Sequence, residues 1–237
     1  MNLKASVLVN GEKVNLLTAG ALWLAATETL VVSDLHLEKG SNYAARGALL
    51  PPYDTRTTLR RVAGLMKSLK PRRVISLGDA FHDGGAEARM DEEDAALLSS
   101  LAAAAAWIWV LGNHDPEPPA RFSGSVEIAV RIGALLFRHE PQLRAEAGEI
   151  AGHLHPVARV RTQSRTLRRR CFATDGARLV MPAFGAYAGG LNVRDEAFEP
   201  LFNDLTAYVL GGDGVYPFWG AALAPDPRDA FPFRQTG

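Results

Sequence analysis

The chain has 237 residues, of which 47% are hydrophobic, which is within the range of one large α/β domain spanning residues 1–237. Its 26 basic and 26 acidic residues balance, so the net charge gives no general attraction to nucleic acid or to a membrane surface. The single cysteine, Cys171, excludes a disulfide framework, and no apolar stretch is long enough to cross a bilayer, so we expect a cytoplasmic protein.

The first half of the chain alternates between strand-like and helix-like segments. Short β-like runs occupy residues 3–9, 13–18 and 21–26, and a compact apolar strand at 30–32 leads directly to Asp34. Apolar residues at helical spacing predict a helix from about 56 to 69, capped by Asp54 or Thr55. A strand at 74–77, a helix from 91 to 106 with acids in its first turn, and a strand at 107–110 follow.

The second half is rich in strands and poor in helices. Short strands are predicted at 126–132, 134–137, 149–151, 157–162, 169–174 and 178–181. A β-α-β-α-β half followed by a strand-rich half indicates a pair of sheets with helices outside, rather than a single doubly wound sheet. The last fifteen or so residues contain three prolines and no periodicity, and are expected to be loosely ordered.

Five of the six histidines belong to an ordered pattern whose segments each follow an apolar run. The segments are Asp34-Leu35-His36, Gly78-Asp79, Gly112-Asn113-His114-Asp115, His139 and Gly152-His153-Leu154-His155. Ligands collect at the ends of strands in α/β sheets. An extended backbone would point both members of each Asp-x-His or His-x-His pair to the same side, and the glycines would allow sharp turns after the strands.

All of these candidate donors are carboxylate, amide or imidazole groups, which favours Mn, Fe, Zn or Co over a structural zinc site. Two divalent cations would clamp an anionic phosphate ester and lower the pKa of water enough to supply hydroxide near neutral pH. Taken alone, the motifs have ordinary explanations as loops or turns, and Gly-His-x-His also fits a mononuclear zinc site. Their order, each after a strand, favours a two-metal site that hydrolyses phosphate esters.

Over residues 34–155 these motifs resemble the calcineurin-like metallophosphoesterase superfamily. The resemblance implies a four-layer α/β/β/α sandwich. It also implies that one metal takes Asp34, His36 and His155. The other metal would take Asn113, His139 and His153, and Asp79 would bridge the two.

The same resemblance assigns His114 to proton transfer instead of metal binding. A hydroxide that bridges the metals would attack phosphorus, and His114, oriented by Asp115, would protonate the leaving-group oxygen. Positioned proton transfer of this kind contributes about 10²–10⁴-fold to a rate.

Several longer segments are similar to those of the bacterial ligase-associated DNA damage response phosphoesterases. These segments are Asp34–Gly40, Leu50–Thr55, Gly78–Asp83, Phe137–Pro141, Arg168–Phe172 and Pro182–Asn192. This narrower resemblance implies a manganese-dependent phosphodiesterase or DNA endonuclease of DNA repair, which functions alongside a DNA ligase, a helicase and an exonuclease. The motifs themselves indicate only a phosphate ester.

Five further residues are candidate substrate contacts: His82, Arg138, Arg168, Arg169 and Arg170. His82 lies three residues after Asp79, and Arg138 precedes His139, although both also fit ordinary loop or strand positions. Six arginines lie between Arg159 and Arg170 with no acid among them, a composition suited to phosphate. A run of charge is, however, usually a solvated face.

We therefore predict a metal-dependent phosphodiesterase that acts on DNA. A phosphatase or nucleotide phosphohydrolase for a small molecule would use the same metal core, so the motifs alone do not exclude it. A non-catalytic protein-binding scaffold would have lost ligands or the acid histidine, whereas the set here is complete.

Overall fold

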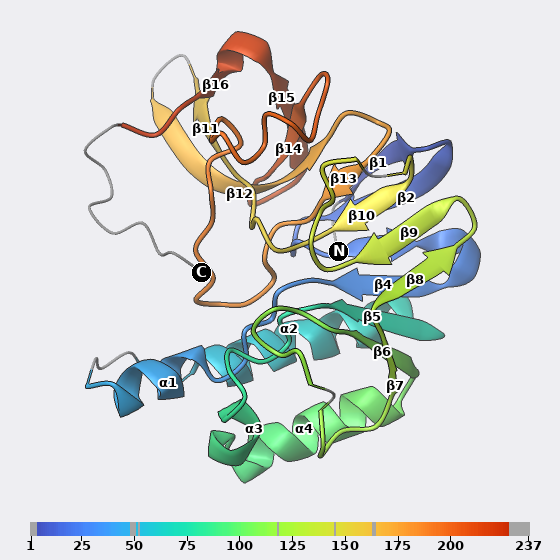
Figure 1. Cartoon of the computed structure of the whole chain (residues 1–237), viewed down its shortest axis with the longest axis vertical. Coiled ribbons are helices and arrows are strands. Elements are labelled where there is room, and N and C mark those ends of the chain that lie inside the picture. Colours follow the sequence, from blue (N-terminus) through green and yellow to red (C-terminus); the bar gives the residue numbers. More distant parts are fainter. Residues whose placement is uncertain are drawn as a thin grey trace.

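Two β-sheets packed face to face form the centre of the molecule (Figure 1). The structure, a computed structural model, describes residues 4–47, 51, 53–117, 119–144, 146–162 and 165–227. Most of the tail that the sequence predicts to be loosely ordered lies outside the described residues.

The first sheet has seven strands in sequence order, β1-β2-β3-β4-β5-β6-β7. Their bounds are β1 Lys4–Val9, β2 Glu12–Leu17, β3 Leu22–Leu24, β4 Thr29–Val32, β5 Arg73–Leu77, β6 Ala106–Val110 and β7 Ser125–Glu127. The strands β1 to β4 pair antiparallel, whereas β4 to β7 run parallel. The carboxyl ends of β4, β5 and β6 therefore meet at one edge of the sheet.

Over the described residues, four α-helices lie on the outer side of the first sheet (Figure 1). They are α1 Lys39–Ala45, α2 Asp54–Leu69, α3 Ala86–Arg89 and α4 Glu92–Ala103, and two 3-10 turns are η1 Ala25–Thr27 and η2 Gly220–Ala222. The helices α2, α3 and α4 contribute to the core there, and α1 packs beside α2 and α3. The helix α4 begins after Asp91, whose carboxylate accepts a hydrogen bond from the N–H of Glu93. None of the helices among the described residues combines the length and the hydropathy that a membrane-spanning helix requires.

The prediction that Asp54 or Thr55 caps α2 is wrong, because the helix already begins at Asp54. The Asp54 carboxylate instead accepts a hydrogen bond from the N–H of Gly40 at 2.9 Å. The Thr55 hydroxyl donates to the carboxylate of Glu38 at 2.8 Å. Both side chains therefore hold the start of α1, a helix that the sequence did not reveal because it lacks apolar periodicity.

The second sheet has the order β15-β14-β12-β13-β10-β9-β8, and β11 and β16 extend it from β12. The bounds are β8 Ala129–Ile132, β9 Leu135–Arg138, β10 Glu149–Ala151, β11 Val157–Arg161, β12 Thr166–Thr174, β13 Leu179–Val180, β14 Thr206–Leu210, β15 Val215–Trp219 and β16 Leu223–Ala224. Most pairs are antiparallel, but β10 runs parallel to both β9 and β13. The second sheet therefore also brings carboxyl ends of parallel strands together.

The chain passes from the first sheet to the second at Ile128. The sequence predicts one strand over 126–132, but the structure divides it into β7 and β8, which belong to different sheets. Ile128 lies between them and is 82% exposed. The apolar pattern continues through this point, so periodicity alone does not reveal the crossing.

Three apolar layers separate the four layers of the fold. Neighbouring strand residues point to opposite faces, so Leu30 packs against the helices while Val31 packs between the sheets. In the second sheet, Phe172 lies between the sheets and Cys171 lies on the outer face with Phe198. The predicted α/β sandwich is confirmed, and over the described residues no α-helix follows α4, so irregular chain covers the outer face of the second sheet.

Candidate metal centre

The predicted donors converge where parallel strands of both sheets end. Asp34, Asp79 and Asn113 follow β4, β5 and β6, while His139 and His153 follow β9 and β10. Asp34 is fully buried, Asp79 is 2% exposed and His139 is 5% exposed. Residues from distant parts of the chain therefore share one site at the edge where parallel sheets collect ligands.

Asp34, His36 and His155 form a first group, with one donor atom from each residue within 4.8 Å of the others. Asp34 Oδ1 lies 3.2 Å from His155 Nε2, and His36 Nε2 lies 3.2 Å from the same nitrogen. Two imidazole nitrogens this close cannot both carry a proton, so at least one presents a lone pair to the space between them.

Asp79, His139 and His153 form a second group with the same spacing. The amide oxygen of Asn113 lies 3.0 Å from both His139 Nε2 and His153 Nδ1. Asp79 lies between the groups: its Oδ1 is 3.4 Å from His139 Nε2 and its Oδ2 is 3.8 Å from His36 Nε2. A carboxylate with one oxygen toward each group has the orientation needed to bridge two cations.

The charges at this site fit divalent metal ions. Among the described residues, neither Asp34 nor Asp79 has a lysine or arginine as an ion-pair partner, and histidines face both carboxylates. Burial raises the pKa of Asp34, but three histidines, led by His155, outweigh it and hold this pKa well below its ordinary value. Burial lowers the pKa of His139, but Asp79 and Asp34 raise it to about 9. In the absence of metal, His139 is the imidazole whose raised pKa favours a charge beside these carboxylates, and the donors are those of transition-metal sites.

The donors occupy strained backbone. Left-handed φ values between +42° and +67° occur at Asp34, His36, Asp79, His153 and His155. Such conformations are uncommon for residues other than glycine, and they persist where the surrounding structure imposes them, often at functional sites. The prediction that the Asp-x-His and His-x-His segments are extended is therefore wrong, because all four of their polar residues have positive φ.

Two glycines allow the loops of the two sheets to approach each other. A Cβ at Gly152 would lie 2.5 Å from Asp34 Oδ2. Without it, the N–H of His153 reaches both carboxylate oxygens of Asp34 at 3.2 Å. Gly78 has a φ of +75°, and a Cβ there would lie 2.2 Å from His139 Nδ1. The sequence predicts turns at these positions, and the structure adds that Gly152 is required for space.

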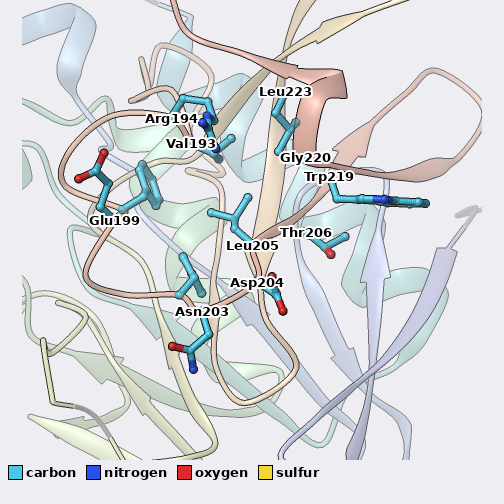
Figure 2. Close-up of a pocket in the computed structure, with 12 residues that line it drawn as sticks. Val193, Arg194, Glu199, Asn203, Asp204, Leu205, Thr206, Trp219, Gly220 and Leu223 are labelled. Atoms are coloured by element: carbon cyan, nitrogen blue, oxygen red, sulfur yellow. The ribbon is translucent and has the colours of Figure 1, made fainter.

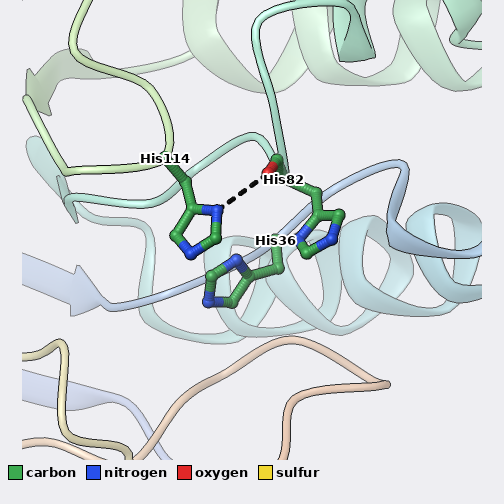
Figure 3. Close-up of side chains that lie close together, drawn as sticks. All are labelled: His36, His82 and His114. Atoms are coloured by element: carbon green, nitrogen blue, oxygen red, sulfur yellow. Dashed lines mark hydrogen bonds between the residues drawn. The ribbon is translucent and has the colours of Figure 1, made fainter. Parts of the chain in front are cut away.

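His114 lies beside the donor groups and is held at two points (Figure 3). Its Nδ1 donates to the carbonyl oxygen of His82 at 3.0 Å, which places a proton on Nδ1 and leaves Nε2 for another partner. Its backbone N–H donates to Asp79 Oδ1 at 2.9 Å. The ring also meets the ring of His36 edge-on, with 5.1 Å between centroids.

The carboxylate of Asp115 is engaged by backbone N–H groups. It accepts hydrogen bonds from Ala80 at 2.7 Å and from Phe81 at 3.2 Å. Burial raises the pKa of Asp115 to about 6. Asp115 thus fixes the loop that follows Asp79. These hydrogen bonds all come from backbone N–H groups, so the expected influence of Asp115 on the His114 ring would pass through the backbone of this loop.

His82 completes a cluster of three imidazoles with His36 and His114 (Figure 3). Its ring stacks on that of His114, at 5.3 Å between centroids, and on that of Tyr43 in α1, at 6.3 Å. Burial, followed by the charges of Lys39 and His114, lowers the pKa of His82 to about 4. A neutral ring therefore lies between His114 and α1, at the border of the donor groups.

Arg138 lies beside a buried acid. Its Nε is 3.8 Å from Glu149 Oε2, and Glu149 also forms an ion pair with Arg178. An ion pair within the protein therefore accounts for the position of this guanidinium.

The three consecutive arginines on β12 differ in their surroundings. Arg168 forms an ion pair with Asp226 at 3.2 Å, and Arg170 is half-buried and donates to the carbonyl oxygen of Ala183 at 2.8 Å. Arg169 is exposed. Of the three, Arg169 is therefore the best placed to meet a ligand from solution.

Sequence reasoning missed Ser33 and Tyr43. The buried Ser33 hydroxyl donates to Asp34 Oδ2 at 2.5 Å. A polar residue directly before the Asp34 motif, at the end of an apolar strand, is the signal that could have identified it. Tyr43 was missed because the pattern does not predict α1.

A separate cavity of about 460 Å³ opens between residues 193–206 and η2 (Figure 2). Phe198, Leu205 and Trp219 are among the side chains that line it. None of the predicted site residues lines this cavity, so it is distinct from the metal centre.

Comparisons with known proteins agree with this geometry. The profile of the family described as calcineurin-like phosphoesterase matches residues 27–168. The crystal structure of Pseudomonas putida nuclease MPE superposes with a TM-score of 0.71 and 26% identity, covering 91% of this chain and 100% of that chain. Yfce, a phosphoesterase from E. coli, reaches a TM-score of only 0.41 with 15% identity, over 79% of this chain and 95% of that chain. The comparison with curated proteins finds no match.

Proposed function

This chain belongs to the calcineurin-like phosphoesterase family and is a metal-dependent phosphoesterase, and we propose that it is a phosphodiesterase that cleaves DNA. The observation that carries the proposal is the position of Asp79, whose two carboxylate oxygens face two separate groups of donors. A pair of cations bridged in this way would suit the hydrolysis of a phosphate ester, because it would stabilise both the attacking and the leaving oxygen, and the choice of a diester is supported by the likeness to a nuclease.

We assign the donors to two metal ions. The first would be held by Asp34, His36 and His155, the second by Asn113, His139 and His153, and Asp79 would supply a ligand to both. Manganese is the expected metal, and iron, zinc or cobalt would accept the same donor types. When bound, the ions polarise the phosphoryl oxygens and lower the pKa of water toward neutrality.

We assign proton transfer to His114. Because the carbonyl oxygen of His82 holds Nδ1–H, Nε2 is the atom that delivers a proton to the leaving oxygen. The hydrogen bond from the His114 N–H to Asp79 ties this ring to the bridging carboxylate. Asp115 supports the arrangement by fixing the backbone after Asp79. We also assign a substrate contact to His82, whose ring stacks on that of His114.

The choice of DNA as substrate is supported by likeness to a nuclease. The similarity to nuclease MPE covers 100% of that chain at 26% identity. The exposed Arg169 adds a side chain suited to a phosphate contact. We further propose a role in DNA repair alongside a DNA ligase, a helicase and an exonuclease, on the basis of the sequence motifs shared with the ligase-associated subfamily.

An assay of metal-stripped protein tests this function. Mn, Zn or Mg is added back, and an aryl phosphodiester, an aryl phosphomonoester and a supercoiled plasmid are compared as substrates. We expect manganese to support diester cleavage and plasmid nicking. Strong preference for the monoester, with the plasmid left intact at every metal concentration, would instead establish a phosphatase or nucleotide phosphohydrolase.

A charge-removing variant provides the matched control. Asp79→Asn keeps the size of the side chain but removes the bridging charge, so it should bind fewer than two manganese ions and lose diester cleavage. Asp175→Asn changes the same group in a loop after β12, where its Oδ1 accepts backbone N–H groups, and should retain both metals. Equal metal content in the two variants would contradict the assignment of Asp79.

A further inference from the structure

Two half-buried arginines lie near the Asp34–His36 turn without a carboxylate partner. Arg61 is on α2 and Arg170 is on β12. Over the described residues, neither guanidinium forms an ion pair with an acidic residue, and burial lowers the pKa of both. Burial, followed by the charge of Arg170, lowers the pKa of Arg61 to about 10. Like charges withdrawn from water are costly unless other groups compensate them.

Backbone carbonyl groups provide this compensation. Arg61 donates from Nη1 to the carbonyl oxygen of Phe184 at 2.8 Å and from Nη2 to that of Ala19 at 2.6 Å. Its guanidinium carbon also lies 4.2 Å from the centroid of the Phe184 ring. Arg170 donates from Nη1 to the carbonyl oxygen of Ala183 at 2.8 Å. Two consecutive carbonyl groups thus each accept a charge-assisted hydrogen bond.

The peptide groups that accept these bonds also bind the backbone of the metal centre. The N–H of Phe184 donates to the carbonyl oxygen of Ser33 at 2.8 Å, and the N–H of Gly185 donates to that of Asp34 at 3.1 Å. Each guanidinium therefore binds the oxygen of a peptide group whose N–H donates to the Ser33–Asp34 backbone. Hydrogen bonds linked in series polarise and strengthen one another.

Residues 183–186 lie directly between α2 and this turn. A Cβ at Gly185 would lie 2.4 Å from the carbonyl oxygen of Leu35. On the other side, the hydroxyl of Thr58 on α2 accepts a hydrogen bond from the N–H of Ala186 at 3.1 Å. The ring of Phe184 is fully buried. The segment is therefore fixed on both sides, and a shift of it would move the turn.

We propose that Arg61 and Arg170 are positioning residues of the metal centre. Through residues 183–186 they hold Asp34 and His36 in the left-handed conformation that directs both side chains toward the first metal. This proposal rests on the assignment of those two residues as metal ligands. It predicts that removal of a guanidinium weakens that metal site without touching any donor.

Manganese binding to metal-free protein tests this role without an activity measurement. Arg61→Gln and Arg170→Gln should each weaken one of the two manganese sites by about 10-fold, the low end of the loss that follows removal of a group supporting a ligand. The other site should keep its affinity. Arg61→Lys, which retains the charge but can reach only one carbonyl well, should recover part of the loss.

Arg159→Gln is the matched control. The Arg159 guanidinium also donates to a backbone carbonyl, that of Pro225 at 2.9 Å, which is outside residues 183–186. The control should keep both manganese affinities, even where its melting temperature falls. If Arg61→Gln does not fold, the manganese affinities of Arg61→Lys and Arg170→Gln can be compared with those of Arg159→Gln instead.

The outcomes separate this proposal from the function on which it rests. Unchanged affinities at both sites in folded Arg61 and Arg170 variants would overturn the positioning role and leave the metal ligands in place. Wild-type protein that binds fewer than two manganese ions would overturn the ligand assignment and, with it, this proposal.

Discussion

The parallel and antiparallel parts of the two sheets carry different features. Every predicted metal donor follows β4, β5, β6, β9 or β10, and each of these strands has a parallel neighbour. The antiparallel strands β11 and β12 carry the arginine cluster and contribute no donor. Carboxyl ends of parallel neighbours lie at the same edge, whereas antiparallel neighbours alternate. The pairing direction therefore decides where donors from distant segments can meet.

The two sheets also differ in the chemistry that they supply. The first sheet provides the oxygen donors, which are Asp34, Asp79 and Asn113, together with His36. The second sheet provides only imidazoles, which are His139, His153 and His155. Each proposed metal would thus be held from both sides of the interface between the sheets.

Replacement of His114 by alanine should have the largest effect on the rate of cleavage. This residue lies at the edge where the parallel strands end, and it is the one that we assign to proton transfer. We expect diester cleavage to fall about 10²–10⁴-fold. The metal content should remain that of wild type, measured by elemental analysis beside the rate. Loss of metal in this variant would place His114 among the ligands.

Replacement of Gly152 by alanine tests the contact between the sheets. The added Cβ would collide with Asp34, so we expect manganese binding to weaken by about 10- to 100-fold. Gly64→Ala is the control: Gly64 lies in α2 with nothing within 4 Å of a Cβ, and alanine there should raise stability by about 0.5–1 kcal/mol. Equal metal affinity in the two variants would show that the loops after β4 and β10 can move apart without loss of metal binding.

Replacement of Arg169 by glutamine tests whether the antiparallel region takes part in function. If Arg169 contacts a DNA phosphate, the slope of log affinity against log salt concentration should fall by about 1, with no change in metal content. Binding titrations at several salt concentrations measure this slope. An unchanged slope would restrict substrate contact to the parallel edge.

The smallest expected effect concerns Asp83, which pairs with Arg89 and Asn42 outside the donor groups. Burial raises the pKa of Asp83, but its hydrogen bonds from Arg89 and Asn42 outweigh this and lower it to about 2. Because the pKa is lower in the folded state, the stability that the carboxylate contributes is present above about pH 4 and lost as the pH falls toward 2.

Asp83→Asn should remove this pH dependence of stability. The free energy involved is at most about 2 kcal/mol, because the ion pair between Asp83 and Arg89 is partly exposed. Urea unfolding of metal-free protein between pH 5 and pH 2.5 measures it. If the free energy of unfolding falls by the same amount with pH in wild type and variant, groups other than Asp83 cause the acid sensitivity.

The sequence was sufficient to predict the elements that have their own apolar pattern. The helices α2 and α4 and the strands β4, β5 and β6 follow from local spacing, and so does the order of donors at the strand ends. The division at Ile128 was not predictable, because it depends on which sheet each half joins. The left-handed backbone at His153 and the space required at Gly152 were not predictable either, because both arise from contact between the sheets.

The facing nitrogens of His36 and His155 are separated by 119 positions in the chain. A chain still being synthesised has the carboxylate edge before it has the second sheet, so it lacks the complete set of donors. The capacity to hydrolyse a phosphate ester would therefore arise only when the sheets have docked. Metal that binds only the docked state would in turn stabilise the docking, so chelation should loosen the interface between the sheets before either sheet unfolds.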